Sequence, residues 1–183
     1  MDSIVLFEKY IKLGVDEKYL VSIIAHKYNG KTTVPQLSIH SLWARNTFAE
    51  ILSSIIKVSL VEKRGDKLVM SDYILRDIKK IAPYITIDDL KEIILWQGVV
   101  ELEEFCKIYG IKSSGSKEEL VLRIMDSGLD IKEILAKLSR REHLEQLCIV
   151  GNINPEGTKE ELINRIVKHA KKIMRPFYRF YHS

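Results

Sequence analysis

The sequence predicts a mainly helical protein, in which an N-terminal group of helices with one small β-hairpin precedes two copies of a helix–loop–helix unit. Three observations support this prediction. Apolar residues recur at helical spacing through most of the 183 residues. Residues 59–70 change to β-prone runs on either side of a tight turn. Residues 102–124 and 144–166 repeat each other without a gap, at an offset of 42 positions.

The composition is that of a globular chain of one to three small modules, with 46% hydrophobic residues, 30% charged residues and a formal net charge of +4. No apolar run approaches the ~18 residues that span a bilayer, and the start of the chain lacks the features of a signal peptide. We therefore expect no membrane partner and a cytoplasmic, nucleoid-associated or nuclear location. Cys106 and Cys148 occupy equivalent repeat positions and are expected to be buried thiols.

In the N-terminal region the sequence predicts helices over residues 3–13, 16–28, 38–43 and 47–58. Gly14 is expected to end the first helix, and Asn46 to cap the last. Residues 30–33 (Gly-Lys-Thr-Thr) are expected to form a turn, because the earlier glycine and the preceding strand of a phosphate-binding loop are missing. Pro35 interrupts the stretch between the second and third predicted helices.

Residues 59–63 and 67–70 are β-prone runs around Arg64-Gly65-Asp66, a pattern typical of a hairpin. The predicted helices, followed by a hairpin, resemble the winged helix-turn-helix family across residues 1–82. The resemblance implies that residues 47–58 enter the major groove of DNA and that the hairpin touches its backbone or minor groove. Winged helices also serve as protein-docking modules, and both readings stay open here. The candidate nucleic-acid contacts are Arg45, Asn46, Lys57, Lys63, Arg64 and Lys67.

A further helix is predicted after Pro83, because Thr86 and Asp89 have the spacing of a capping box. Its apolar run continues to Leu95, and Gly98 is expected to end it. We interpret residues 83–98 as a connector helix.

Each copy of the repeat begins with an amphipathic helix, continues through an extended loop and ends in a second helix. Ser116 and Thr158 are the predicted N-caps of these second helices, and Glu119 and Glu161, three residues later, complete a capping box. The two units are expected to span residues 99–139 and 140–170.

This pattern resembles the SAP family of DNA-binding modules in residues 99–127 and again in residues 141–170. The resemblance implies binding of double-stranded DNA, and the related rho N-terminal fold, which binds RNA, leaves the type of nucleic acid open. The contacts that it implies are Gly115, Ser116, Lys117 and Arg123 in the first copy and Gly157, Thr158, Lys159 and Arg165 in the second.

Helix N-termini attract phosphate through free N–H groups and the helix dipole, and a glycine there allows close approach. The acidic residues of the same turns, Glu118, Glu119, Glu160 and Glu161, oppose phosphate binding and have helix capping as their simpler role. Acids outnumber bases 13 to 9 between residues 99 and 163. We therefore expect the second copy, which is followed by a basic tail, to bind more strongly, with Lys159 contributing more than Lys117.

The tail, residues 171–183, interleaves aromatic residues with Lys171, Lys172, Arg175 and Arg179. Such a mixture suits backbone neutralisation and base stacking. Alternatively, the aromatic side chains fold back onto the second repeat unit.

The five histidines have no metal-binding spacing, and the chain has no aspartate cluster of a metal nuclease. The sequence therefore predicts a protein without catalytic residues, metal or cofactor. Its expected partner is nucleic acid, most simply double-stranded DNA held by its backbone, in chromatin, transcription, replication or repair. The alternative is an adaptor that binds protein partners in such an assembly.

Overall fold

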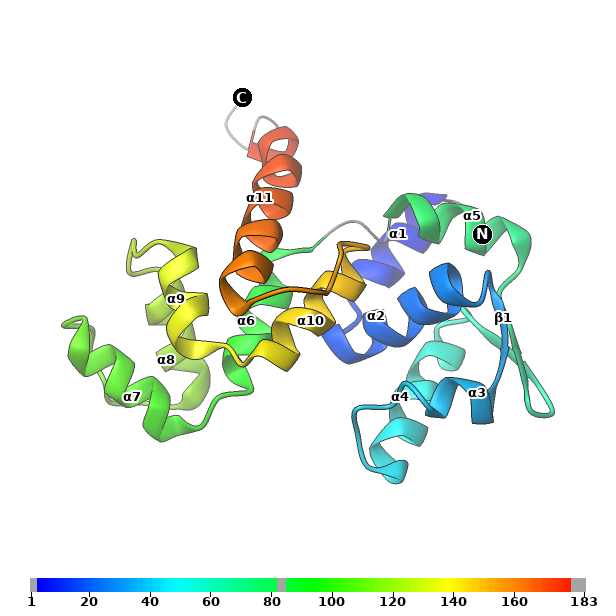
Figure 1. The fold of residues 1–183 in the computed structure, drawn as a ribbon, viewed down its shortest axis with the longest axis horizontal. Coiled ribbons are helices and arrows are strands. Elements are labelled where there is room, and N and C mark those ends of the chain that lie inside the picture. The colour runs from blue at the N-terminus through cyan, green and yellow to red at the C-terminus, as the bar shows by residue number, and fades with distance from the viewer. Residues whose placement is uncertain (1–2, 82–84, 179–183) are drawn as a thin grey trace. The chain divides into compact units, whose positions relative to one another are not determined.

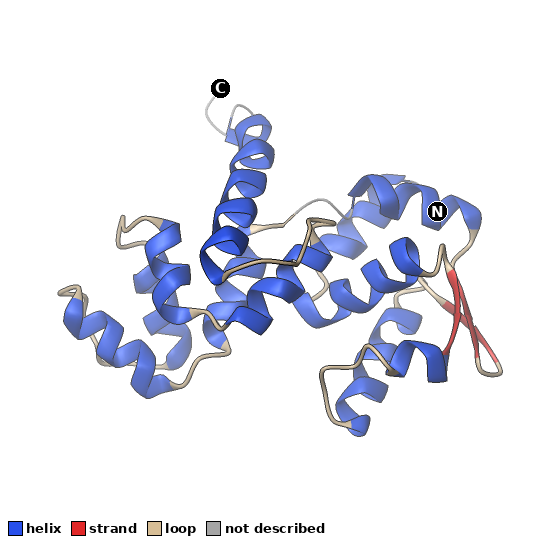
Figure 2. Cartoon of the chain, viewed as in Figure 1, coloured by secondary structure: helices blue, strands red, loops and turns tan. Residues whose placement is uncertain are grey.

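The computed structural model describes residues 3–81 and 85–178, which belong to two compact units, Met1–Pro83 and Tyr84–Ser183 (Figure 1). Helices dominate both units, and a small three-stranded antiparallel sheet lies in the first (Figure 2). The predicted fold class, mainly helical with a small β element, is confirmed at this level.

In unit 1 the small sheet packs beside a core of helices. Its elements are α1 (Ser3–Ile11), α2 (Val15–Ser22), a π-helical turn η1 (Ile23–Lys27), β1 (Lys31–Thr33), α3 (Val34–Ser38), α4 (Arg45–Lys57), β2 (Glu62–Arg64), β3 (Lys67–Val69) and α5 (Asp72–Ile81). Helix α1 packs against α5, and α2 packs against α4. Leu20 of α2, Ile55 of α4 and Leu68 of β3 are fully buried in this core.

The sheet has the order β1-β3-β2, with Leu68 of the central strand opposite Thr32 on one side and Lys63 on the other. Strand β1 corrects the prediction of a turn over residues 30–33. A three-residue strand forms there because its backbone groups pair with β3, far away in the chain. The predicted β-run at residues 59–63 begins late, at Glu62, because Ser59 adopts a left-handed φ of 63°.

Two predicted helices of unit 1 start at other residues than expected. Helix α3 begins at Val34 and ends at Ser38, so the prediction of a helix over residues 38–43 was wrong. Thr33 and Gln36 form a capping box, and Pro35 lies in the first helical turn, where the missing N–H costs nothing. Helix α4 begins at Arg45 after an Ala44 N-cap, rather than after Asn46.

Unit 2 consists entirely of helices within the part of it that the structure describes. They are α6 (Ile87–Leu95), α7 (Val99–Ile108), α8 (Lys117–Met125), α9 (Ile131–Leu138), α10 (Arg141–Val150) and α11 (Lys159–Tyr178). Helices α7 and α8 pack together, as do α10 and α11, which are their counterparts in the second copy.

Helix α6, expected as a connector, packs against α8 in the same way as α9 packs against α11. The repeat therefore has three helices, α6–α7–α8 and α9–α10–α11. The buried pair Ile93 and Ile94 of α6 corresponds to Ile134 and Leu135 of α9. Leu-Lys-Glu-Ile at residues 90–93 and Ile-Lys-Glu-Ile at 131–134 repeat at an offset of 41, which is the sequence signal for this longer repeat.

The basic residues of the predicted tail fall at the end of the chain. Lys171, Lys172 and Arg175 lie in the C-terminal part of α11, whose side chains the structure does not describe. Arg179 lies outside the described residues.

Candidate nucleic-acid interface

The first helix of each copy ends in the same hydrogen-bonded turn. The N–H of Ile111 donates to the carbonyl of Cys106 at 2.8 Å, and the N–H of Ile153 donates to Cys148 at 2.7 Å. Between them, Gly110 and Asn152 adopt left-handed φ angles of 67° and 51°. These are the features of a Schellman motif, in which glycine or asparagine reverses the chain. Both extended loops therefore leave their helices in the same direction.

The second helix of each copy begins with the predicted capping box. The Ser116 hydroxyl accepts a hydrogen bond from the N–H of Glu119 at 3.2 Å, and the Glu119 carboxylate accepts one from the N–H of Ser116 at 2.9 Å. The matching distances between Thr158 and Glu161 are 3.3 and 2.8 Å. The pKa of the Glu161 carboxyl is lowered, chiefly because the carboxylate accepts the backbone N–H of Thr158. Both predicted N-caps are confirmed.

An arginine holds each loop against its helix. The guanidinium of Arg123 donates to the carbonyls of Lys112 and Ser114, the latter at 2.7 Å. In the second copy, the guanidinium of Arg165 donates to the carbonyls of Asn154, at 2.8 Å, and Glu156. These two predicted contact residues therefore use several N–H donors within the protein. Their first role is to fix the shape of the loop.

The same guanidinium groups lie beside the capping carboxylates. Arg123 Nη2 is 3.5 Å from Glu119 Oε2, and Arg165 Nη2 is 3.9 Å from Glu161 Oε2. One of the two acids in each first turn is therefore offset by an arginine. This reduces the repulsion that the sequence alone suggested between these turns and a phosphate.

Gly115 and Gly157 sit at the centre of this arrangement with φ angles of 131° and 120°. A Cβ on Gly115 would lie 2.2 Å from Glu119 Oε2 and 2.5 Å from Arg123 Nη2, and a Cβ on Gly157 would meet the equivalent atoms of Glu161 and Arg165. The space beside each glycine is thus taken by the protein's own carboxylate and guanidinium, rather than left open for a phosphate. Both glycines and the adjacent N-cap residues are solvent-exposed.

The two loop-to-helix segments, residues 111–124 and 153–166, show the same sequence of buried, half-buried and exposed positions throughout. Their buried positions are Leu120, Val121 and Ile124 in the first copy and Leu162, Ile163 and Ile166 in the second. The duplication in sequence is therefore a duplication in structure.

The lysines of the two copies differ in their surroundings. Lys159 Nζ donates to the carbonyl of Ala136, in the last turn of α9, at 2.7 Å, and burial lowers the pKa of this ammonium. The structure shows no such anchor for Lys117, which is half-buried. Lys159 is therefore engaged within the protein, while the ranking of the two lysines as ligand contacts stays a prediction.

The charge around the loops is also more favourable to an anionic ligand in the first copy than in the second. Residues 111–124 carry three bases and two acids, and residues 153–166 carry two bases and three acids. Helix α11 runs from Lys159 to Tyr178, so Lys171 lies about 18 Å along its axis from Lys159. That distance exceeds the Debye length of about 8 Å at physiological salt. The contribution of the tail to the charge at the second loop rests on side chains that the structure does not describe, so it stays a prediction.

The candidate residues of unit 1 lie on α4 and the β2–β3 hairpin. Arg45 and Asn46 are exposed in the first turn of α4, and Lys57 is exposed in its last turn. On the hairpin Lys63, Arg64 and Lys67 are exposed. Arg64 pairs with Glu62 at 2.9 Å, which raises the pKa of its guanidinium and offsets part of the positive charge there.

Within residues 3–81 and 85–178, no three histidine, cysteine, aspartate or glutamate side chains are grouped so as to hold a metal ion. The same residues include no helix of the length and hydropathy needed to cross a bilayer. Cys106 and Cys148 are buried free thiols, as predicted.

Comparisons of the chain with models of protein families, with curated proteins and with solved structures give no match.

Proposed function

We propose that this chain is a non-enzymatic nucleic-acid-binding protein that holds double-stranded DNA mainly by its backbone. The SAP-like loops of unit 2 are the main contact in this proposal, with the first copy contributing more than the second. Unit 1 acts as a winged-helix-like module that adds contacts from α4 and the hairpin. The roles that follow for such a protein are in chromatin, transcription, replication or repair.

The observation that carries the proposal is the rigid, exposed start of α8. Gly115, Ser116 and Glu118 are exposed at the positive end of the helix dipole. The capping box uses the N–H groups of Ser116 and Glu119, so a phosphate would approach the first turn at Lys117 and Glu118 rather than beside Gly115. The Glu119 carboxylate accepts the N–H of Ser116, and the guanidinium of Arg123 offsets its negative charge. Lys117 supplies a cation in the same turn. Because the Schellman turn, the capping box and the arginine already order the loop, a phosphate would bind there without paying for loop ordering.

The order of elements in unit 1 supports the second part of the proposal. The succession of helix, strand, two helices and a hairpin, with the first strand added beside the hairpin, is similar to that of winged helices. In such an arrangement α4 takes the recognition-helix position. Its exposed polar residues Asn46, Thr47 and Ser53 are then the candidates for contact with base edges.

The test is a fluorescence anisotropy titration of the whole chain with a labelled duplex at several salt concentrations. We expect the logarithm of the binding constant to fall linearly with the logarithm of salt, with a slope of about −0.9 per phosphate contacted. Lys117→Glu should weaken binding, whereas the matched charge reversal Lys80→Glu, at an exposed position of α5 outside the proposed contacts, should have little effect. If the duplex does not bind even at low salt, the proposal fails.

The second candidate function is a protein-binding adaptor. One observation favours it, namely an apolar groove on unit 1 that a purely polar DNA-reading surface does not require.

A further inference from the structure

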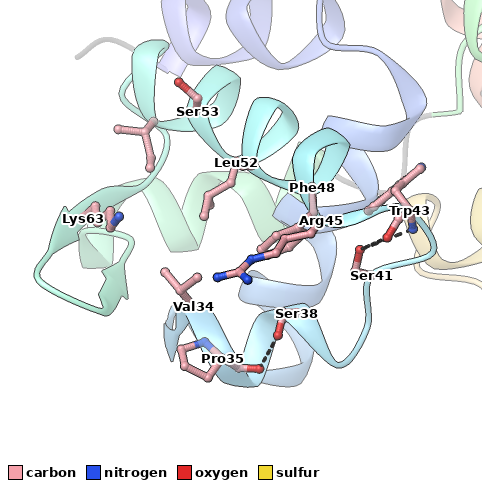
Figure 3. Close-up of a pocket in the computed structure, with 12 residues that line it drawn as sticks. Val34, Pro35, Ser38, Ser41, Trp43, Arg45, Phe48, Leu52, Ser53 and Lys63 are labelled. Carbon is pink, nitrogen blue, oxygen red and sulfur yellow. Dashed lines mark hydrogen bonds between the residues drawn. The ribbon is translucent and has the colours of Figure 1, made fainter.

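A groove of about 840 Å³ lies in unit 1 between α3, α4 and the start of the hairpin (Figure 3). Its lining is mainly apolar and includes Val34, Pro35, Trp43, Phe48, Leu52 and Ile56, with three serines among the polar lining residues. Phe48, Leu52 and Ile56 are spaced four residues apart, so they form one stripe along α4 at the floor of the groove. Phe48 and Leu52 are each 6% exposed, so they present only an edge to an occupant. Pro35 of α3 lies on the opposite wall, as Figure 3 shows.

The apolar surface extends beyond the groove. Ile39 and Leu42 belong to the segment between α3 and α4, next in sequence to the lining residues Ser38 and Trp43, and are 79% and 58% exposed. Large apolar side chains at this exposure, beside an apolar groove, are typical of a surface that another molecule covers. A DNA backbone is a poor fit for such a surface, because its phosphates require polar and cationic contacts.

The charged residues of the groove are of one sign. Arg45 and Lys63 line it, and none of its lining residues is an aspartate or glutamate. Figure 3 shows the Arg45 side chain extended from the first turn of α4 toward Val34, with Lys63 on the hairpin beyond Val34. Within the described residues, no carboxylate forms an ion pair with Arg45 or Lys63. An occupant that complements this groove is therefore apolar along its length and acidic where it meets Arg45 and Lys63.

The dimensions of the groove fit a helix. From Arg45 to Ile56 the lining of α4 extends for about 17 Å, the length of three helical turns. The exposed Ala49, on the same wall, has a small side chain that allows close approach. Recognition of an amphipathic helix in a hydrophobic groove, through apolar residues at i, i+3, i+4 and i+7, is a recurring mode of peptide binding.

We propose that this groove binds an acidic amphipathic helix of a partner protein, whose apolar face covers Phe48, Leu52 and Ile56 and whose carboxylates pair with Arg45 and Lys63. This interaction does not involve the proposed contacts of unit 2 with DNA, but it shares Arg45 and Lys63 with the contacts proposed for unit 1. It would bring a protein partner to the bound nucleic acid.

The test begins with a displayed library of random peptides selected for binding to the whole chain and depleted on the variant Ala49→Glu. This substitution fills the groove and adds a negative charge at an exposed helical position, so folding is preserved. We expect the enriched peptides to carry apolar residues at helical spacing together with an excess of aspartate and glutamate. If enriched peptides are basic, or if none is enriched over the Ala49→Glu variant, the proposal is overturned.

One enriched peptide is then labelled and titrated by anisotropy against matched variants of the whole chain. Ala49→Glu and Arg45→Glu should each weaken binding by about tenfold or more. Thr47→Glu adds the same charge to the same helix at an exposed position outside the groove, and should leave the affinity unchanged. Equal effects of Thr47→Glu and Ala49→Glu would exclude the groove as the site.

The same variants separate a protein partner from DNA. The peptide should stay bound at duplex concentrations that saturate the chain, because unit 2 is the main proposed contact with DNA. Ala49→Glu should weaken peptide binding at least tenfold more than duplex binding. If the duplex displaces the peptide, or if Ala49→Glu weakens the duplex as much as the peptide, the groove belongs to the DNA interface and the proposal is wrong. Loss of duplex binding in unit 2 variants alone would count against the proposed function and leave this inference intact.

Discussion

The ammonium group of Lys159 donates a hydrogen bond to the carbonyl oxygen of Ala136, 2.7 Å away, and so ties the start of α11 to the end of α9. A cation at the C-terminus of a helix is favourable because it meets unpaired carbonyls and the negative end of the dipole. Its counterpart Lys117 has the same place in the repeat, and the structure shows no such hydrogen bond for it. The two lysines are therefore equivalent in sequence and different in their contacts.

The first prediction separates these roles. Lys117→Glu should weaken duplex binding by several-fold or more, and Lys159→Glu should weaken it less, because Lys159 is engaged within the protein. Conversely, Lys159→Met should lower the free energy of unfolding by about 1 kcal/mol, and Lys117→Met should lower it by less. Anisotropy titrations and urea unfolding of the four variants measure both effects. A larger loss of duplex affinity for Lys159→Glu would restore the ranking expected from sequence.

The second prediction concerns the glycines of the first loop. Gly115→Ala should destabilise the protein by about 1–3 kcal/mol, because φ is 131° there and the new Cβ would meet Glu119 and Arg123. Gly110→Asn is the matched control: φ is 67°, nothing lies within 4 Å of an added Cβ, and the second copy has Asn152 at the equivalent place. It should change the free energy of unfolding by only a few tenths of a kcal/mol. Urea denaturation compares the two, and equal losses would contradict the assigned role of Gly115.

Elements whose signals depend on neighbouring residues could be predicted from the sequence, and those that depend on distant pairing could not. The capping boxes at Ser116 and Thr158 were predicted because they depend on residues three positions apart, whose interaction is local. Strand β1 was missed because its pairing with β3 involves residues 36 positions away, which no local pattern reveals. The start of α3 had a local signal, Thr33 with Gln36, but Pro35 was taken as a break rather than as a first-turn residue.

The contacts of the candidate site were predicted less fully than the fold. Gly115, Ser116 and Lys117 lie together at an exposed helix start, as the sequence indicated. The internal hydrogen bonds of Arg123 and the anchoring of Lys159 could not be foreseen, because both depend on how loops and helices are placed in three dimensions. The apolar groove was also missed, since its walls come from α3, α4 and β2 and no single segment displays it.

The third prediction concerns the pH dependence of stability and the contact of His143, in α10, with Trp96 and Gln97, which directly follow α6. Gln97 Nε2 lies 3.4 Å from His143 Nδ1, and the Trp96 ring lies edge-to-face with the imidazole at 4.9 Å. An amide nitrogen only donates, so His143 must accept at Nδ1 and stay neutral to keep this contact. Burial, followed by the charge of Arg140, lowers the pKa of His143 from its ordinary value of 6.5.

The sign of the effect follows from proton binding. Below pH 6.5 the unfolded state binds more protons at His143 than the folded state does, so stability is present above that pH and falls as pH drops through it. Urea midpoints between about pH 7.5 and 5.5 should decrease in the natural chain and decrease less in His143→Gln. His26 and His40, whose pKa values are also lowered by burial, add a similar dependence in unit 1. An unchanged pH dependence in His143→Gln would show that this contact is not the source.

The fourth prediction concerns the two thiols. Burial raises the pKa of Cys148 to about 11 and raises that of Cys106 as well. Since the thiolate is the reactive form, only about one Cys148 in a thousand is ionised near pH 8, and access is blocked as well. The folded protein should therefore react with dithiobisnitrobenzoate far more slowly than free cysteine, and both thiols should react at once in urea. The variant Cys106→Ser isolates Cys148; rapid labelling of this variant without urea would mean that α10 separates readily from α11, contrary to the packing of the second repeat.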